Sequence, residues 1–417
     1  MREIRRLSDD EFLDFARISA NAYPAFPIRT EEELQRMAER FREQDQDSGQ
    51  PLFYGLFEAG TLLGGMELYD YMMNLHGVQT LVAGVGGVAV DLLHKKEHVA
   101  RDMVRFFLNH ARDKGAVLAL LYPFRPDFYK QMGFGYGTKL NEYRVRPAGL
   151  PKGTTRQHIA WLSPDDKPLL LDCYQRCQAR THGLIQRSEA DFTRFFTSPE
   201  RRVVGYKRDG QIEGYLAFTF HPHEQGNFLI NDLHVSEIVY ETREALAELL
   251  TFLHSQADQV RAVVIRTQDE EFHHLLLDPR NGSETLLPSV YHPSNVQGVG
   301  LMYRVIDLPG IFKQLGKHDF GGQSCRVKIS IGDSFFPANA GSLVVRFRNG
   351  QPLVSEEATH DVEIRLDVAE FSSLLLGVVS FRSLYLYHLA DISDPDYLET
   401  VNRLFLVPNK PICLTAF

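Results

Sequence analysis

The sequence predicts an α/β protein in which two similar repeats stand in tandem and a separate α+β domain follows them. The segment 58–66 is similar to 208–216, because both place a glycine-containing turn in front of an apolar strand. A helix end followed by a strand also recurs, at 107–122 and at 252–266. Such recurrence in the same order predicts one structural unit used twice. From about Gly298 the pattern changes, which indicates the third domain.

Three domains are therefore expected. The first repeat spans residues 1–150, the second 151–297, and the third domain 298–417. A stretch rich in proline and glycine at 147–153 is typical of a linker between the two repeats. The 417 residues, 44% of them hydrophobic, are sufficient for several packed domains with a sizeable core.

In the first repeat, two capped helices are expected to precede a meander of antiparallel strands. Acidic residues after Ser8 and after Thr30 are typical of helix starts, and the second helix is expected to reach about Arg42. Apolar runs between turn residues predict the strands. The expected elements are a short first strand, strands at 52–58, 62–73 and 81–90, a helix of about 20 residues containing Met103, a strand at 116–122, a short helix ended by Gly133, and a strand through Val145.

The second repeat is expected to follow the same order, and the third domain combines strands with capped helices. In the third domain we expect a strand at 299–308, a helix at 310–315, strands at 325–331 and 342–348, and an amphipathic helix at 367–376.

Charge and composition exclude several classes of function. The net charge is −9 and no long basic run occurs, so nucleic-acid and anionic-membrane binding are disfavoured. No stretch has the roughly 18 apolar residues of a membrane span, and the first residues do not resemble a signal peptide. The four cysteines form no metal-ligand cluster, and His221, His223 and the pair His273-His274 lack a third ligand at useful spacing, so no metal is expected. A cytoplasmic location is expected.

The segment 85–103 joins an apolar, valine-rich strand to a helix. Lys95 and Lys96 stand at the junction, where a helix N-terminus presents free N–H groups. This combination is suited to a pyrophosphate. The corresponding segment of the second repeat, 233–242, carries acidic residues in place of the lysines, so no anion site is expected there.

The segment Val88 to Ala100 resembles motif A of the GNAT N-acetyltransferases, and Phe128 to Phe134 resembles their Phe-Tyr-x-x-x-Gly-Phe element. The tandem repeats, the third domain and the terminal Cys-x-x-x-Phe are together similar to the enhanced intracellular survival (Eis) family of acetyltransferases. The resemblance spans essentially the whole chain. It implies two GNAT-like domains, the second without a CoA motif, and a third domain similar to sterol carrier proteins.

The resemblance also implies acetyl-CoA as cosubstrate. Backbone groups of Val88 and Val90 are expected to bind the pantetheine arm, while the motif Arg/Gln-x-x-Gly-x-Gly/Ala cradles the pyrophosphate. That motif corresponds to Lys95, Lys96, His98, Val99 and Ala100. Lysine replaces arginine, which gives a point charge instead of a bidentate fork. His98 replaces a glycine; in an αR geometry its N–H would still face the phosphates. An ordinary strand-to-helix junction with solvated lysines is the alternative.

Two residues are expected to handle protons. Tyr129 resembles the family's general acid, although Tyr122 and Tyr136 lie nearby in sequence and Tyr129 could instead be a packed core tyrosine. The α-carboxylate of Phe417 resembles the family's proton acceptor, which needs desolvation or a water relay to act as a base. A frayed tail is the alternative, but the last seven residues carry no charge.

These features predict an acetyl-CoA-dependent N-acetyltransferase in which an amine attacks the thioester directly in a ternary complex. The resemblance implies an aminoglycoside-like or other polycationic small-molecule acceptor and a homo-oligomer, a hexamer in the family. The second hypothesis is a non-catalytic degenerate GNAT protein that binds an apolar ligand or a protein partner through its C-terminal domain. The acidic residues at the second junction, and His98 at the first, support that alternative.

Overall fold

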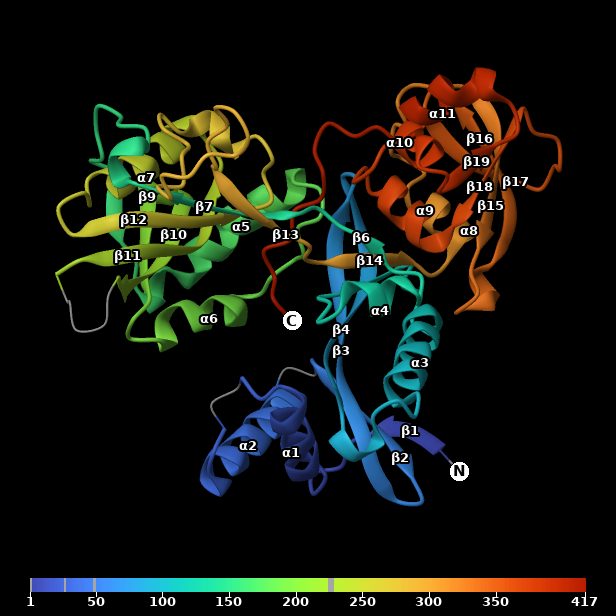
Figure 1. Ribbon diagram of the computed structural model, residues 1–417, viewed down its shortest axis with the longest axis horizontal. Coiled ribbons are helices and arrows are strands. Elements are labelled where there is room, and N and C mark those ends of the chain that lie inside the picture. Colours follow the sequence, from blue (N-terminus) through green and yellow to red (C-terminus); the bar gives the residue numbers. More distant parts are fainter. Residues whose placement is uncertain (1, 26–27, 48–49, 224–228) are drawn as a thin grey trace. The chain divides into compact units, whose positions relative to one another are not determined.

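The computed structural model describes residues 2–25, 28–47, 50–223 and 229–417. The chain forms two compact units. The first contains the residues up to Gly137 together with Leu301–Lys410 and Thr415–Phe417; the second contains Thr138–Gly300 and Pro411–Leu414. Each unit is described below by itself (Figure 1).

A twisted seven-stranded sheet in the order β1-β2-β3-β4-β5-β14-β6 forms the centre of the first repeat. Helices α1 and α2 cover one face through a core of phenylalanines, and α3 packs on the other face with Met103, Val104 and Phe107 (Figure 1). The elements are β1 (Arg2–Arg6), α1 (Phe12–Ala22), α2 (Glu31–Asp47), β2 (Leu52–Glu58), β3 (Thr61–Leu75), β4 (Val78–Val90), a short 3-10 turn (Leu92–His94), α3 (Val99–Asp113), β5 (Leu118–Leu121), α4 (Pro126–Lys130), β6 (Gly135–Tyr136) and β14 (Met302–Val305).

The third domain, in the same compact unit, has a five-stranded sheet in the order β17-β16-β15-β18-β19. Its helix α9 packs against β14 and β6 of the first sheet. The elements are α8 (Leu308–Gln314), β15 (Cys325–Gly332), β16 (Gly341–Arg348), β17 (Gln351–Ser355), β18 (Val362–Asp367), α9 (Val368–Leu375), α10 (Phe381–Leu386), β19 (Ala390–Ile392) and α11 (Leu398–Leu404).

The second compact unit repeats the sheet in the order β13-β7-β12-β11-β10-β9-β8. Helices α5 and α6 share one hydrophobic core with some of the strand residues. Helix α7 shares a second core with other strand residues. The elements are β7 (Leu140–Val145), β8 (Ile159–Trp161), α5 (Lys167–Arg180), α6 (Glu189–Thr197), β9 (Arg202–Arg208), β10 (Gln211–Pro222), β11 (Asn231–Tyr240), α7 (Arg243–His254), β12 (Val260–Thr267) and β13 (Asn295–Gly298).

Two strands lie in sheets that their sequence position does not suggest. β7 lies within the expected first repeat but pairs with β12 in the second sheet, and β14 follows the second repeat but pairs with β5 in the first. The compact units therefore divide near 137 and 300 rather than at the expected 150 and 297. The stretch 147–153 is not a loose linker, because Leu150 is fully buried in the core of the second unit. Strand pairing is non-local, so composition along the chain does not reveal such an exchange.

In the part of the chain that the structure describes, no helix combines the length and apolar character of a membrane span. Within the same residues, no cluster of three or more metal-ligating side chains is found.

Candidate active site

β4 and β5 run side by side for only a short distance. Their parallel pairing extends from Val82 opposite Leu118 to Val85 opposite Leu121, after which β4 continues on β3 alone as far as Val90. The strands therefore part at Val85. Beyond this point the main chain of β4 is no longer paired with β5, and its N–H and C=O groups on that side are available to a ligand.

β4 carries a bulge just past the parting point. Gly86 pairs with Glu67 and Ala89 with Gly65, so β4 has one residue more than β3 between the two pairs. Gly87 has a φ of 55°, and a Cβ on it would lie 2.5 Å from Glu67 Oε1, so the bulge requires glycine. The bulge contains Val88, one of the residues predicted to bind the cosubstrate. Its carbonyl accepts a hydrogen bond of 2.8 Å from the Tyr23 hydroxyl.

The N-terminus of α3 is uncapped and presents its amides. The first intrahelical bond runs from the Asp102 N–H to the His98 carbonyl, and the His98 side chain does not cap the helix. The amides of residues 99–101 precede that bond and have no helical acceptor. His98 has φ 66° and ψ 9°, which is a left-handed rather than an αR conformation. The αR geometry considered for His98 is therefore not the one observed: the histidine adopts the conformation that glycine favours, at a cost of about 1 kcal/mol.

A cavity of about 630 Å³ lies between the end of β4, the start of α3 and α4. All seven predicted cofactor residues line it: Val88, Val90, Lys95, Lys96, His98, Val99 and Ala100. Lys95 and Lys96 are exposed, and neither forms an ion pair with a described residue. Sequence reasoning missed several lining residues; all of them except Arg101, which follows Ala100 directly, come from distant segments. These are Tyr23 at the end of α1, Arg101 on α3, Phe124 and Arg125 before α4, and Phe335 of the third domain.

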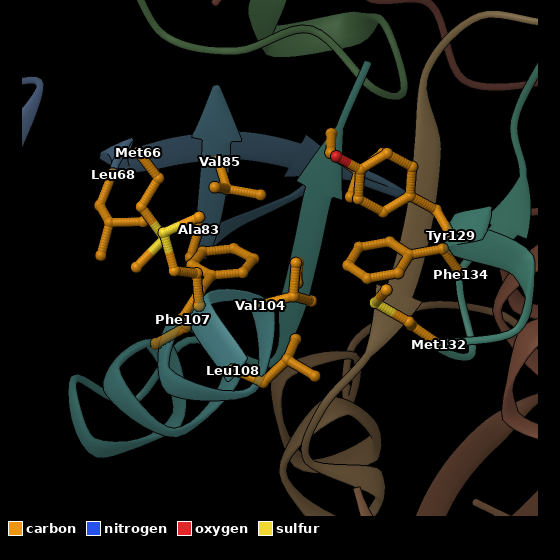
Figure 2. Packing of buried hydrophobic residues seen from close by; sticks show 14 of the residues in the cluster. Met66, Leu68, Ala83, Val85, Val104, Phe107, Leu108, Tyr129, Met132 and Phe134 are labelled. Carbon is orange, nitrogen blue, oxygen red and sulfur yellow. The ribbon is translucent and has the colours of Figure 1, made fainter. Parts of the chain in front are cut away.

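Tyr129 lies on α4 and is only 3% exposed. Its ring packs edge-on against Phe128 and Phe134, and Figure 2 shows its hydroxyl turned toward the carboxyl end of β5. Burial raises the pKa of the Tyr129 phenol well above its usual value, and the nearby Tyr23 adds to the shift. The adjacent Phe128 and Met132 line the cavity. Tyr129 thus lies in the core directly beside residues that line the cavity.

Phe417 packs on the other part of β4 and is not frayed. Its ring contacts three tyrosines, with centroid separations of 5.6, 5.4 and 5.2 Å: Tyr69, Tyr71 and Tyr122. The Tyr122 hydroxyl also donates a hydrogen bond of 3.1 Å to the Thr415 carbonyl. Tyr122 therefore anchors the end of the chain.

Two glycines on β4 provide the space that Phe417 occupies. A Cβ on Gly84 would lie 3.0 Å from a ring carbon of Phe417, and a Cβ on Gly86 would lie 3.0 Å from its main-chain carboxyl carbon. Only hydrogen as a side chain permits this approach. The carboxyl group of Phe417 is thus placed against the strand that carries Val88 and Val90.

Glu67 is a half-buried acid at this site that the sequence reasoning missed. It is paired in register with Gly86, and its carboxylate accepts a hydrogen bond of 2.6 Å from the Tyr69 hydroxyl. Burial raises the pKa of the Glu67 carboxyl, while the hydrogen bond from Tyr69 opposes the shift. The alternation of Glu67, Tyr69 and Tyr71 opposite a glycine-rich strand was the available signal, since such spacing places all three on one face of β3.

Three family comparisons agree with this arrangement. Residues 3–137 and 183–305 each match an acetyltransferase (GNAT) domain, and residues 311–414 match a sterol carrier protein domain. The chain thus combines two acetyltransferase (GNAT) domains with a sterol carrier protein domain, the domain order that the resemblance to the Eis family predicts. The predicted fold class is therefore confirmed, and so is the enzyme class, an acyltransferase.

Two relatives with N-acetyltransferase names are similar to this chain over most of its length. An uncharacterized N-acetyltransferase of Streptomyces coelicolor is 25% identical over 354 residues, which are 78% of this chain and 79% of the relative. One of Streptomyces griseus is 23% identical over 437 residues, covering 100% of this chain and 99% of the relative. Among solved structures that both chains cover completely, a GCN5-related N-acetyltransferase from Anabaena variabilis has a TM-score of 0.81 at 15% identity, and Eis1 from Mycobacterium abscessus 0.77 at 20%. These structural likenesses concern the fold.

Proposed function

We propose that the protein transfers the acetyl group of acetyl-CoA to an amine of a small, polycationic molecule such as an aminoglycoside. One observation carries the proposal. The seven residues expected to bind the cosubstrate line a single cavity at the parted end of β4, and the carboxyl group of Phe417 lies against the same strand. A donor site and a proton acceptor thus meet on one strand, as direct transfer in a ternary complex requires.

The cavity suits each part of the cosubstrate. The parted strand offers main-chain groups at Val88 and Val90 to the pantetheine arm, although the Val88 carbonyl already accepts the Tyr23 hydroxyl. The uncapped start of α3 and the unpaired lysines offer N–H groups and positive charge to the pyrophosphate. Arg101 and Arg125 add two further cations, which suit the remaining phosphate.

In the proposed reaction, the nitrogen of the acceptor amine forms a bond to the thioester carbonyl carbon, and the carbon–sulfur bond then breaks. The carboxylate of Phe417 accepts the proton that the nitrogen loses. The Tyr129 phenol donates a proton to the departing thiolate and regains one from solvent. The raised pKa of Tyr129 keeps the phenol protonated at neutral pH, as a general acid must be, and its action then depends on close positioning.

The surroundings of Phe417 favour a cationic acceptor. Three tyrosine rings surround the Phe417 ring next to its carboxyl group: Tyr69, Tyr71 and Tyr122. Aromatic faces attract ammonium groups, and the net charge of −9 favours the approach of a polycation. The family resemblance further supports a cytoplasmic homohexamer, which light scattering on purified protein tests.

The deciding experiment combines a binding and an activity measurement. Thermal denaturation is followed with CoA at up to millimolar concentration, and acetyl transfer is then assayed with aminoglycosides, polyamines and lysine-bearing peptides. We expect CoA to raise the melting temperature and at least one polyamine-like acceptor to be acetylated. No stabilisation by CoA would reject the proposal in favour of a degenerate binding protein. Stabilisation with transfer only to peptides would reject the small-molecule acceptor.

A further inference from the structure

Arg304 is a fully buried arginine of the first compact unit that the proposed reaction does not use. It lies on β14, the strand that pairs with β5 on one side and with β6 on the other. Its Nη2 donates hydrogen bonds of 2.8 and 2.6 Å to the two carboxylate oxygens of the equally buried Asp333. Its Nε and Nη1 have no hydrogen-bond partner among the described residues. Such a pair is a costly element of a fold, because apolar residues of similar volume often serve as well.

Asp333 holds a turn of the third domain beside β14. Its carboxylate accepts hydrogen bonds from the Phe336 N–H at 2.8 Å and from the Asn339 side chain at 3.3 Å. The Asn339 side chain also donates a hydrogen bond of 2.9 Å to a carbonyl of β14. Within this turn lies Phe335, which packs in the core of the first repeat and lines the cavity. The ion pair of Arg304 with Asp333 therefore fixes one wall of the cavity.

Phe335 also connects this turn to the start of α3. The guanidinium groups of Arg101 and Arg105 lie 5.7 and 5.1 Å from the centre of the Phe335 ring. Arg101 itself lines the cavity. A displaced Phe335 would therefore change both the apolar wall and the cationic end of the cavity.

The other edge of the Arg304 guanidinium lies against Gly133. A Cβ on Gly133 would overlap Nη1 and would lie 2.8 Å from Cζ. Gly133 also has a φ of 80°, so the position requires glycine for its backbone conformation as well as for space. The same guanidinium lies 6.0 Å from the centre of the Phe134 ring. Arg304 thus supports the chain where α4 ends.

The Gly133 turn determines how Tyr129 is held. The N–H groups of Met132 and Phe134 both donate to the Tyr129 carbonyl, at 2.9 and 3.2 Å. The side chains of these three residues pack in one core cluster (Figure 2). Because α4 has only five residues, it is too short to be stable by itself. The direction of the Tyr129 ring therefore depends on the packing of the turn.

We infer that Arg304, paired with Asp333, is a positioning residue for the candidate active site: it supports the Gly133 turn that orients Tyr129, and it holds the Phe335 wall of the cavity. The inference rests on the proposed function for its catalytic consequence. A planar guanidinium serves both contacts, because one edge bonds a carboxylate while the other packs on a main chain. An apolar side chain would fill the space at Gly133 but would not hold Asp333.

Two full-length variants separate the two contacts, and a third is the control. Arg304→Lys keeps a cation for Asp333 but lacks the planar edge that packs on Gly133. Arg304→Met with Asp333→Asn, the uncharged variant, leaves no buried charge unpaired, and the asparagine still offers an oxygen to the turn. Arg326→Met with Asp361→Asn is the matched control. Arg326 and Asp361 form an ion pair in the same third domain, and neither lines the cavity.

Amide hydrogen exchange and CoA titration measure the two contacts without relying on turnover. In Arg304→Lys and in the uncharged variant, the amides of Met132 to Phe134 should exchange at least tenfold faster, while those of α3 stay protected. The uncharged variant should also bind CoA about tenfold more weakly, because the Phe335 wall loses its support. CoA affinity should stay within about twofold of wild type in Arg304→Lys. The control should resemble the wild type in both measurements.

A double-mutant cycle with Tyr129→Phe tests whether Arg304 acts through Tyr129. Arg304→Lys should lower kcat by about tenfold to hundredfold, since a shift of about 1 Å can cost about a hundredfold, and should change the KM for acetyl-CoA by less than about twofold. In the Tyr129→Phe background, the same substitution should lower kcat by less than about twofold, because the hydroxyl that Arg304 positions is already gone. A merely structural role would instead multiply the two losses.

Several results would overturn the inference. Unchanged exchange at the Gly133 turn in the uncharged variant would show that Arg304 does not support the turn. Unchanged CoA affinity in that variant would show that the pair does not hold the Phe335 wall. Multiplied losses in the cycle would show that Arg304 does not act through Tyr129, and an equal effect of the control would assign the losses to the stability of the third domain. If the wild-type protein acetylates no amine, the proposed function fails, and the exchange measurement still decides whether Arg304 supports the turn.

Discussion

The chain contains the same strand-to-helix junction twice, and the two copies differ in what satisfies the helix start. In the first repeat, His98 leaves the first amides of α3 without a side-chain cap, beside two unpaired lysines. In the second, the Thr242 side chain accepts the Ala245 N–H at 3.2 Å and caps α7. An uncapped N-terminus retains its affinity for an anion, while a capped one has given up part of it.

The strands that lead into the two junctions differ in the same sense. β4 has glycine at 84, 86 and 87, which leaves its face open to Phe417. β11 instead carries Glu237, whose carboxylate accepts hydrogen bonds from Arg187 and Tyr215. The comparison teaches that side-chain volume and helix capping at a few positions decide whether the same sheet architecture leaves space for a ligand or is filled by its own side chains.

The largest expected effect comes from extending the chain beyond Phe417, whose carboxylate is the proposed proton acceptor. One glycine added after Phe417 moves the carboxylate away from Gly86 and replaces it with an amide, which is no base. We expect kcat to fall by about a thousandfold, within the usual range for general-base catalysis. Calorimetric titration should show CoA affinity within twofold of wild type. Retained turnover would remove the carboxylate from the mechanism.

Filling the open face of β4 should come next. In Gly86→Val, the new side chain must displace the Phe417 carboxyl group, which lies 3.0 Å from the Cβ position. A shift of about 1 Å can cost about a hundredfold in kcat. Steady-state kinetics measures the loss. Gly332→Ala is the control in the same compact unit, since a Cβ on Gly332 would lie 3.8 Å from its nearest neighbour, Asp367 Oδ2, and this variant should behave as wild type.

Removing the junction's positive charge should weaken cosubstrate binding. Lys95→Gln with Lys96→Gln should raise the dissociation constant of CoA about tenfold at low salt, and by less at high salt because of screening. Titration calorimetry at two ionic strengths checks both values. Lys152→Gln removes a similarly exposed lysine of the second compact unit and should leave CoA affinity unchanged. An equal effect of Lys152→Gln would mean that the lysines act only through net charge.

Substitutions at the two helix starts should have opposite signs. His98→Gly relieves a left-handed conformation and should increase the free energy of unfolding by about 0.5–1 kcal/mol. Thr242→Ala removes a cap and should decrease it by about 1 kcal/mol. Chemical denaturation measures both changes. If His98→Gly destabilises the protein, the histidine side chain must make a favourable interaction that outweighs the strain.

The smallest expected effect is a pH-dependent change in stability on substitution of Glu67. Because burial raises the pKa of Glu67, its contribution to stability is present at low pH and is lost as pH rises through the folded-state value. Glu67→Gln should therefore be more stable than wild type by about 0.5 kcal/mol near pH 8, and the gap should close toward pH 4. Thermal melts across this range measure it.

Glu11 is the control with the opposite sign. The hydrogen bond from Arg5 lowers the pKa of Glu11 to about 2, so its contribution is present above the unfolded-state value and is lost as pH falls. Glu11→Gln should therefore destabilise the protein at neutral pH, and this loss should shrink in acid. Parallel pH profiles for Glu67→Gln and Glu11→Gln would contradict the burial of Glu67.

Local pattern was sufficient for much of the fold. Turn residues and apolar period placed β2, β3, β4 and α9 within a few residues of their observed bounds, and the Lys95–Ala100 segment was correctly placed at a helix start. The helix after that junction is shorter than expected, with 15 residues, because it ends at Asp113 just before Gly115, whose φ is 85°. These features depend on neighbours in the chain, so the sequence reports them directly.

What the sequence determined by itself was the repeat, the fold class and the position of the Lys95–Ala100 segment at a helix start. Only the tertiary structure decided the exchange of β7 and β14, the left-handed His98, the burial of Glu67 and the seat of Phe417. Each depends on atoms that lie far apart in the chain, such as Gly86 and Phe417, and no local periodicity records such an approach. Long-range packing, rather than propensity, gave one of two similar sheets a cavity and a seat for Phe417, and gave the other a buried ion pair.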